Sequence, residues 1–108
     1  MKDVILAVDE SIGSTGVAIF KGNKLIATKR IKTKSEQLTQ ERMTIIEKEL
    51  REMAEKYKAT VFLAEDVYVN KSIMSYKYNL FIQGMLFTLS KNVEDSIYCL
   101  YHPTHWRK

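Results

Sequence analysis

Apolar residues in this sequence form short continuous runs separated by polar turns. These runs cover residues 4–8, 17–20, 60–64 and 97–101. Continuous runs of this length that are rich in β-branched residues are typical of strands buried inside a sheet. Residues 25–31 mix apolar and basic side chains, as expected for a half-exposed strand, and the Gly22-Asn23 pair predicts a hairpin turn before them. The pattern therefore predicts five strands.

Two other segments have the three- and four-residue spacing of helices. Residues 33–57 carry one apolar stripe, and Thr33-Lys34-Ser35-Glu36 predicts the capping box at which this helix begins. The stripe consists of Met43, Ile46, Leu50, Met53 and Tyr57. Its other faces are charged, and we expect their side chains, Arg42 included, to be solvated. The second helix, residues 73–91, is apolar on more than one face, so it either lies inside the core or packs against a second subunit.

The predicted order strand-strand-strand-helix-strand-helix-strand defines the fold class. We expect an α/β fold with a mixed five-stranded sheet, in which a three-strand antiparallel meander is extended by two parallel strands through helical crossovers. The 108 residues fit a single domain. Cys99 is the lone cysteine, so no disulfide framework exists, and no apolar stretch reaches the ~20 residues of a membrane span. We therefore expect a cytoplasmic protein with no membrane partner.

Two of the predicted strands end on carboxylates, Asp9 after the first and Glu65 after the fourth. If these strands are parallel neighbours, both side chains emerge at the carboxyl edge of the sheet, where α/β folds bind ligands. Paired carboxylates repel unless a cation neutralises them, and hard oxygen ligands suit Mg²⁺ or Mn²⁺. The small polar residues within 10–16 favour close approach of a phosphate, which together with a divalent ion suits phosphodiester cleavage. The alternative is that both carboxylates are strand-end charges without a ligand.

The segments around both carboxylates resemble motifs of the RuvC-like Holliday-junction resolvases. Residues 4–16 combine an apolar strand, Asp9, a serine two residues later and a Thr-Gly pair, as in the first motif of that family. Leu63-Ala64-Glu65-Asp66-Val67-Tyr68 resembles its strand, glutamate and aromatic motif, and Gly84 matches a glycine in the helix that follows. The ending Pro103-Thr104-His105-Trp106-Arg107-Lys108 resembles the Pro-x-x-Trp-Arg-Lys segment of phage-type members. The likeness spans essentially the whole chain.

This resemblance implies a ribonuclease H-like fold and a metal-dependent endonuclease that acts on branched DNA as a homodimer. It also implies that Asp9 and Glu65 are the catalytic residues and hold Mg²⁺ or Mn²⁺, and that Tyr68 stacks on bases opened at the junction. Glu10 stands where the family usually carries Pro or Gly. The family supplies further acids from a last helix after its Arg-Lys segment. We expect residues 1–108 to lack that helix, which leaves the metal site with two protein carboxylates.

DNA contacts are predicted for Tyr68, Ser11, Thr15, Lys29, Arg30 and Lys71. Lys29 and Arg30 belong to the densest basic cluster, and the net charge of +4 fits an anionic partner bound through its phosphates. A solvated edge strand that uses lysine against aggregation is an equally good explanation of this cluster. His102 and His105 have no further ligands nearby in sequence and are poor evidence for zinc.

Two other functions fit parts of the pattern. A catalytically silent DNA-binding or dimerisation module would keep the fold with an incomplete site. The sequence around Asp9 also resembles part of one lobe of an actin-like ATPase. Such proteins need two lobes to enclose ATP, and 108 residues are enough for one lobe. A resolvase is expected at the nucleoid or, for a phage protein, in the host cytoplasm.

Overall fold

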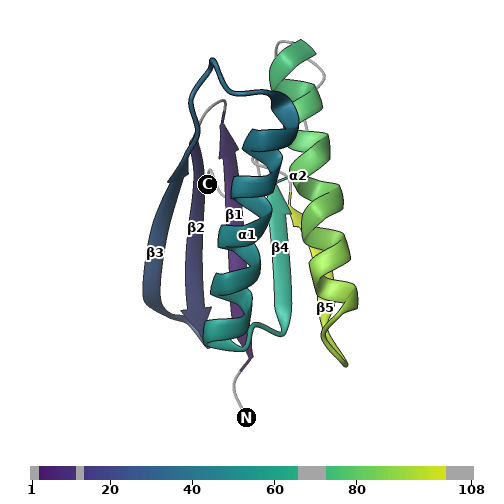
Figure 1. Ribbon diagram of the computed structural model, residues 1–108. Helices are drawn as coiled ribbons and strands as arrows, with labels where there is room; N and C mark the ends of the chain where they lie inside the picture. Colours follow the sequence, from purple (N-terminus) through teal and green to yellow (C-terminus); the bar gives the residue numbers. More distant parts are fainter. Residues whose placement is uncertain (1–2, 12–13, 66–72, 102–108) are drawn as a thin grey trace.

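The computed structural model describes residues 3–11, 14–65 and 73–101. In chain order these residues form β1 (Val4–Ser11), β2 (Ser14–Lys21), β3 (Lys24–Lys32), α1 (Thr39–Tyr57), β4 (Val61–Glu65), α2 (Ile73–Lys91) and β5 (Ile97–Tyr101) (Figure 1). The predicted order of strands and helices is therefore confirmed.

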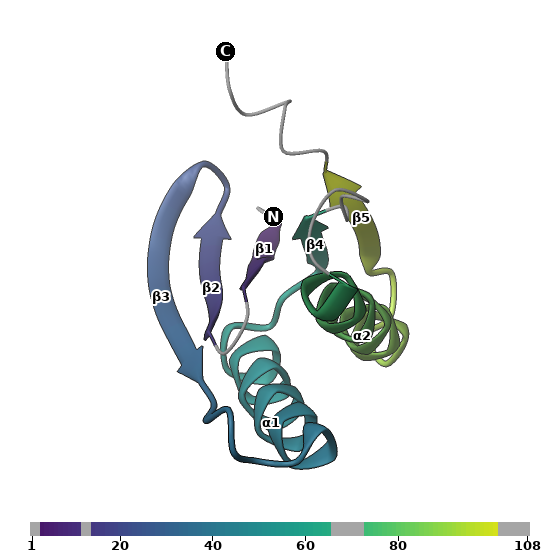
Figure 2. The ribbon, with the colours of Figure 1, turned by 90° about the horizontal axis from the view of Figure 1, so that it is seen from above.

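The five strands belong to one sheet in the order β3-β2-β1-β4-β5. β1 pairs antiparallel with β2, and β2 pairs antiparallel with β3. β4 lies parallel to β1 on one side and to β5 on the other. Helices α1 and α2 make the crossovers, and both cover the same face of the sheet (Figure 2). This arrangement is the predicted one, a meander extended by two parallel strands.

The hydrophobic core lies between the sheet and the two helices. Alternate residues of the central strands point into it, and Leu6, Val8 and Phe62 have no exposed surface at all. Leu50 of α1 and Leu86 of α2, equally buried, belong to the same cluster. Burying a side chain of this size contributes roughly 1.5–3 kcal/mol. The alternation therefore fixes which side chains of each strand turn inward and which turn to the opposite face.

The hairpin between β1 and β2 is longer than the apolar pattern predicted. Three further backbone pairs extend it: Asp9 with Gly16, Glu10 with Thr15, and Ser11 with Ser14. Most of the segment expected to be a polar turn is thus strand, because each added pair satisfies backbone groups that would otherwise need water. The next turn is as predicted, with Gly22 in the left-handed region at a φ of 63°.

Helix α1 begins later than the predicted capping box at residues 33–36. The Leu38 N–H donates a 3.0 Å hydrogen bond to Oε1 of Glu41, so Glu41 caps the first turn from inside the helix. Oγ1 of Thr33 instead accepts a 2.8 Å hydrogen bond from Nε of Arg42. The predicted capping box is therefore wrong, because its threonine serves another side chain and a later glutamate supplies the cap.

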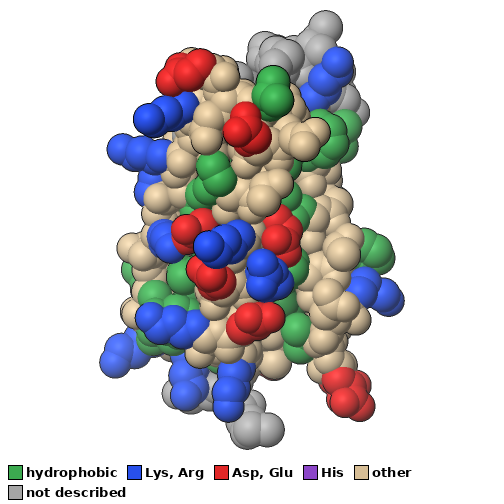
Figure 3. All heavy atoms as spheres, in the orientation of Figure 1, with side chains coloured by type: hydrophobic (Ala, Val, Ile, Leu, Met, Phe, Trp, Pro, Cys, Tyr) green, Lys and Arg blue, Asp and Glu red, His purple; other side chains and the backbone are tan. Residues whose placement is uncertain are grey.

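The outer face of α1 carries interleaved basic and acidic side chains (Figure 3). Nε of Arg51 lies 3.0 Å from Oε2 of Glu47, one helical turn away, and this hydrogen bond raises the pKa of Arg51. The prediction of a solvated charged face is confirmed there. It is wrong for Arg42, which is only 6% exposed because its guanidinium reaches under α2.

Helix α2 has apolar side chains on more than one face, as predicted. Ile82, Leu86 and Leu89 point into the core. Phe81 and Phe87 point outward and are 54% and 47% exposed. In the described part of the chain, no helix is both long enough and apolar enough to cross a membrane.

Candidate active site

The sheet face that α1 and α2 leave uncovered is the open face. One row of side-chain positions crosses it near the carboxyl end of β1. The row is formed by Arg30 on β3, Gly16 on β2, Asp9 on β1, Glu65 on β4 and Tyr101 on β5. We call these five residues the edge row. Strand pairing alone brings them together, since they span residues 9 to 101 in the sequence.

Asp9 and Glu65 occupy neighbouring positions in the edge row. The last registered pair of β1 and β4 is Val8 with Ala64, and both of these residues face the core. Asp9 and Glu65 are the next residues of these two parallel strands. Because successive side chains of a strand alternate between its faces, both lie on the open face. The prediction that the two carboxylates share one sheet edge is thereby confirmed. Glu65 is held further through its backbone carbonyl, which accepts a 3.0 Å hydrogen bond from Nε2 of Gln83 on α2.

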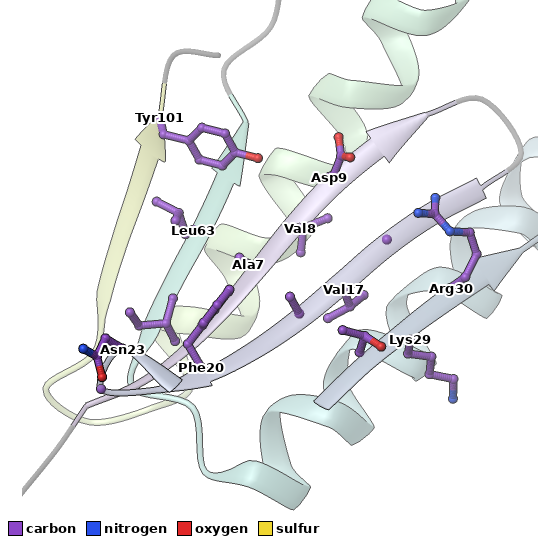
Figure 4. A pocket seen from close by; sticks show the side chains of 15 residues that line it. Ala7, Val8, Asp9, Val17, Phe20, Asn23, Lys29, Arg30, Leu63 and Tyr101 are labelled. Atoms are coloured by element: carbon purple, nitrogen blue, oxygen red, sulfur yellow. The ribbon is translucent and has the colours of Figure 1, made fainter. Parts of the chain in front are cut away.

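Arg30 belongs to the edge row on the side of Asp9 opposite to Glu65. It pairs with Gly16, which in turn pairs with Asp9. Because Gly16 has no side chain, the guanidinium lies over β2, and its Nη1 donates a 3.2 Å hydrogen bond to Oγ of Ser14. In Figure 4 the Arg30 guanidinium and the Tyr101 ring extend inward from the two sides of the row, with Asp9 between them. The site thus combines carboxylates with one cationic group.

Below the edge row the open face is hollowed into a cavity of about 860 Å³. Its floor is mostly apolar and includes Ile5, Ala7, Ala18, Phe20 and Leu63 (Figure 4). Asp9, Arg30 and Tyr101 line the same cavity at its polar end. Lys29 and the polar residues Asn23 and Thr28 also line the cavity, so Asp9 is its acidic lining residue on a mostly apolar surface.

Two of the predicted DNA-contacting residues are not on the open face. The Thr15 side chain points toward the helices and is 1% exposed, so the prediction that it contacts DNA is wrong. Lys29 precedes Arg30 and lines part of the cavity, but its Nζ reaches the opposite side of the sheet, where it pairs with Oε1 of Glu49 on α1. The predicted basic cluster is thus divided between two faces, because successive strand residues alternate.

Three further predicted contacts can be placed only in part. Ser11 ends β1, where its backbone pairs with Ser14. Tyr68 and Lys71 lie outside the described residues, so their predicted DNA contacts, like that of Ser11, stay predictions. His102 and His105 lie outside the described residues as well.

The donor set at the edge row suits a divalent metal ion. Mg²⁺ is commonly bound by one or two carboxylates, with water and substrate phosphate as its other ligands, and Asp9 with Glu65 supplies that number. In the described ranges no three His, Cys, Asp or Glu side chains gather into a larger metal centre. Asp9 and Glu65 are therefore the residues of the edge row that could hold such an ion.

Comparison with solved structures identifies the fold as ribonuclease H-like, the class predicted from the sequence. The structure resembles Thermus thermophilus RuvC in complex with a Holliday junction substrate, with a TM-score of 0.82 and 14% identity over 94% of this chain and 66% of that chain. It also resembles T. thermophilus RuvC in a second structure, with a TM-score of 0.77 and 16% identity over 93% of this chain and 64% of that one.

A third similar structure is the Fowlpox virus resolvase in complex with Holliday junction DNA, with a TM-score of 0.54 and 19% identity over 94% of this chain and 61% of that one. The chain thus spans about two thirds of the RuvC chains and somewhat less of the viral resolvase. No family model and no curated protein sequence matches it. The predicted likeness to RuvC-like resolvases is confirmed at the level of the fold.

The sequence pattern pairs neither Gly16 nor Tyr101 with the carboxylates. Tyr101 lies in a predicted strand without an assigned role, and Gly16 belongs to the polar turn and to the Thr-Gly pair of the first motif. Both become visible once the register is known, because Gly16 pairs with Asp9 and Tyr101 pairs with Glu65. Because side chains alternate along a strand, the sequence of β5 by itself indicates that Tyr101 and Cys99 lie on the same face of the sheet.

Proposed function

We propose that this chain is a metal-dependent endonuclease that cuts branched DNA of the Holliday-junction type by phosphodiester hydrolysis. One observation carries the proposal: Asp9 and Glu65 sit side by side at the carboxyl ends of parallel strands in a fold shared with RuvC. The solved RuvC and Fowlpox virus resolvase complexes contain Holliday junctions, which supports the choice of substrate.

In this proposal the edge row binds and orients the substrate. The Asp9 and Glu65 carboxylates hold Mg²⁺ or Mn²⁺, which supplies charge neutralisation and an activated water when bound. Tyr68 stacks on exposed bases of the DNA, and Lys71 and Ser11 contact the DNA backbone beside these bases. Arg30 contributes positive charge on the same face as the carboxylates. The protein acts in the cytoplasm, at the nucleoid or, for a phage protein, in the host cytoplasm.

The proposed active form is a homodimer through α2. Phe81 and Phe87 expose much of their rings to water on one helix, which is costly for a monomer. A two-fold axis through the Phe81 side of α2 would bury that ring and present two active sites to a junction that itself has two-fold symmetry.

A catalytically silent binding or dimerisation module of the same fold is the second candidate. The exposed aromatic side chains of α2 favour an assembly role that needs no chemistry. The two candidates differ in whether the carboxylates of the edge row matter for DNA cleavage.

Cleavage of a labelled four-way junction and of linear duplex distinguishes them. The assay uses Mg²⁺, Mn²⁺ or EDTA, with the chain as given and with the chain extended by the residues that follow it in its gene. The nuclease proposal expects metal-dependent junction cleavage in at least one of these forms. Asp9→Asn and Glu65→Gln should each lower cleavage by about 100-fold or more, because the metal loses a ligand.

Glu52→Gln, on the solvated face of α1, is the matched control and should cut like the wild type. Junction binding without cleavage in both forms would favour the silent module. Equal affinity for junction and duplex in both forms would refute the resolvase proposal altogether.

A further inference from the structure

Two neighbouring carboxylates repel the DNA backbone that the proposed nuclease must bind. Each phosphate carries a negative charge, and the repulsion is strongest at the edge row, where Asp9 and Glu65 lie side by side. A metal ion offsets part of it. A fixed cation on the same face would offset more of it and would remain when the metal is absent.

Arg30 is the described cation best placed for this task. It stands two strands from Asp9 in the same row, with Gly16 between them. Its Nη1 is held by Oγ of Ser14 at 3.2 Å, which fixes the plane of the guanidinium over β2. Within the described part of the chain Arg30 forms no ion pair with a carboxylate, in contrast to Lys29, whose charge is matched by Glu49.

Gly16 leaves room for the guanidinium in this position. A β-carbon added at Gly16 would lie 3.2 Å from Nη2 and 3.4 Å from Cζ of Arg30. A side chain at this position would therefore press on the guanidinium, which would have to shift by a few tenths of an ångström. The backbone at Gly16 is ordinary strand, so a close approach explains this glycine better than a need for unusual dihedral angles.

We propose that Arg30 binds a phosphate oxygen of the DNA strand laid across the edge row, and that Gly16 makes room for it. The guanidinium matches phosphate geometry through parallel N–H donors, and Ser14 uses only one of them. The phosphate is bound beside the carboxylates, so this contact positions the strand relative to Asp9. The inference rests on the proposed function, because it takes DNA as the ligand.

The test measures binding in EDTA, where no cleavage occurs. Fluorescence anisotropy with labelled junction and duplex, repeated over a range of salt concentrations, gives an affinity and a salt slope for each variant. Arg30→Gln should weaken binding to both DNAs about tenfold and reduce the salt slope by about one, as expected for one lost phosphate contact. Arg30→Lys should keep the salt slope and lose part of the affinity, since lysine keeps the positive charge but lacks the parallel N–H donors of the guanidinium.

Lys24→Gln removes one positive charge from the other end of the same strand and is the control for net charge. It should change the slope far less than Arg30→Gln. Gly16→Ala requires the guanidinium to shift, so it should weaken binding when Arg30 is present and have no further effect in the Arg30→Gln background, because it acts through the same contact. Circular dichroism melting checks that each variant is folded.

Equal salt slopes for Arg30→Gln, Lys24→Gln and the wild type would overturn the inference. So would a Gly16→Ala effect that persists in the Arg30→Gln background, or a wild type that binds no DNA. An Arg30-dependent slope in a chain that never cleaves DNA would support the inference while contradicting the proposed nuclease.

Discussion

The Arg42 guanidinium on α1 donates a 2.7 Å hydrogen bond from Nη1 to the hydroxyl of Tyr78 on α2. Its Cζ also lies 4.9 Å from the centre of the Tyr78 ring. Both residues are buried, at 6% and 8% exposed. A buried cation is tolerated only when its donors are satisfied, so this pair joins the two helices through a polar contact inside an otherwise apolar interface.

Tyr78→Phe should therefore lower the free energy of unfolding by about 1–3 kcal/mol, because it leaves a buried charged donor without its acceptor. Tyr57→Phe is the matched control, since no hydrogen bond of the Tyr57 hydroxyl is found within the described residues. That change should stay within about 0.5 kcal/mol. Urea unfolding followed by circular dichroism measures both. Equal losses for the two variants would contradict a specific Arg42–Tyr78 contribution.

Asp9 and Glu65 should bind Mn²⁺ weakly in the absence of DNA, because two carboxylates leave most ligand positions to water. Water-proton relaxation of titrated Mn²⁺ should give about tenfold weaker binding for Asp9→Asn than for the wild type. Glu52→Gln, which removes an exposed acid from α1, should bind as the wild type does. Equal Mn²⁺ binding by the wild type and Asp9→Asn would remove Asp9 from the metal site.

The exposed aromatic side chains of α2 predict a change of assembly on substitution. Phe81→Glu should shift the protein from dimer to monomer at tens of micromolar, because a carboxylate replaces a ring at the centre of the proposed interface. Leu25→Glu is the control, since Leu25 is comparably exposed, at 51%, but lies on β3 away from α2. Light scattering measures the mass of each. A monomeric wild type at these concentrations would contradict the dimer.

The sequence by itself determined the order of elements, the two-faced character of α2 and the position of Asp9 and Glu65 near the carboxyl ends of β1 and β4. These features depend on short-range patterns, namely apolar runs, helical spacing and polar residues at element boundaries. The start of α1 was missed because Thr33 and Glu36 have the spacing of a capping box, while the bond between Leu38 and Glu41 decides the helix start.

Only the tertiary structure decided which charged residues work together. Lys29 and Arg30 are adjacent in sequence, yet alternation along β3 sends them to opposite faces. Thr15 and Arg42 look exposed by residue type, but packing between sheet and helices buries both. Arg30, Gly16 and Asp9 become neighbours through the register of three strands. Register is set by the sum of many distant backbone and side-chain contacts, and no local pattern contains it.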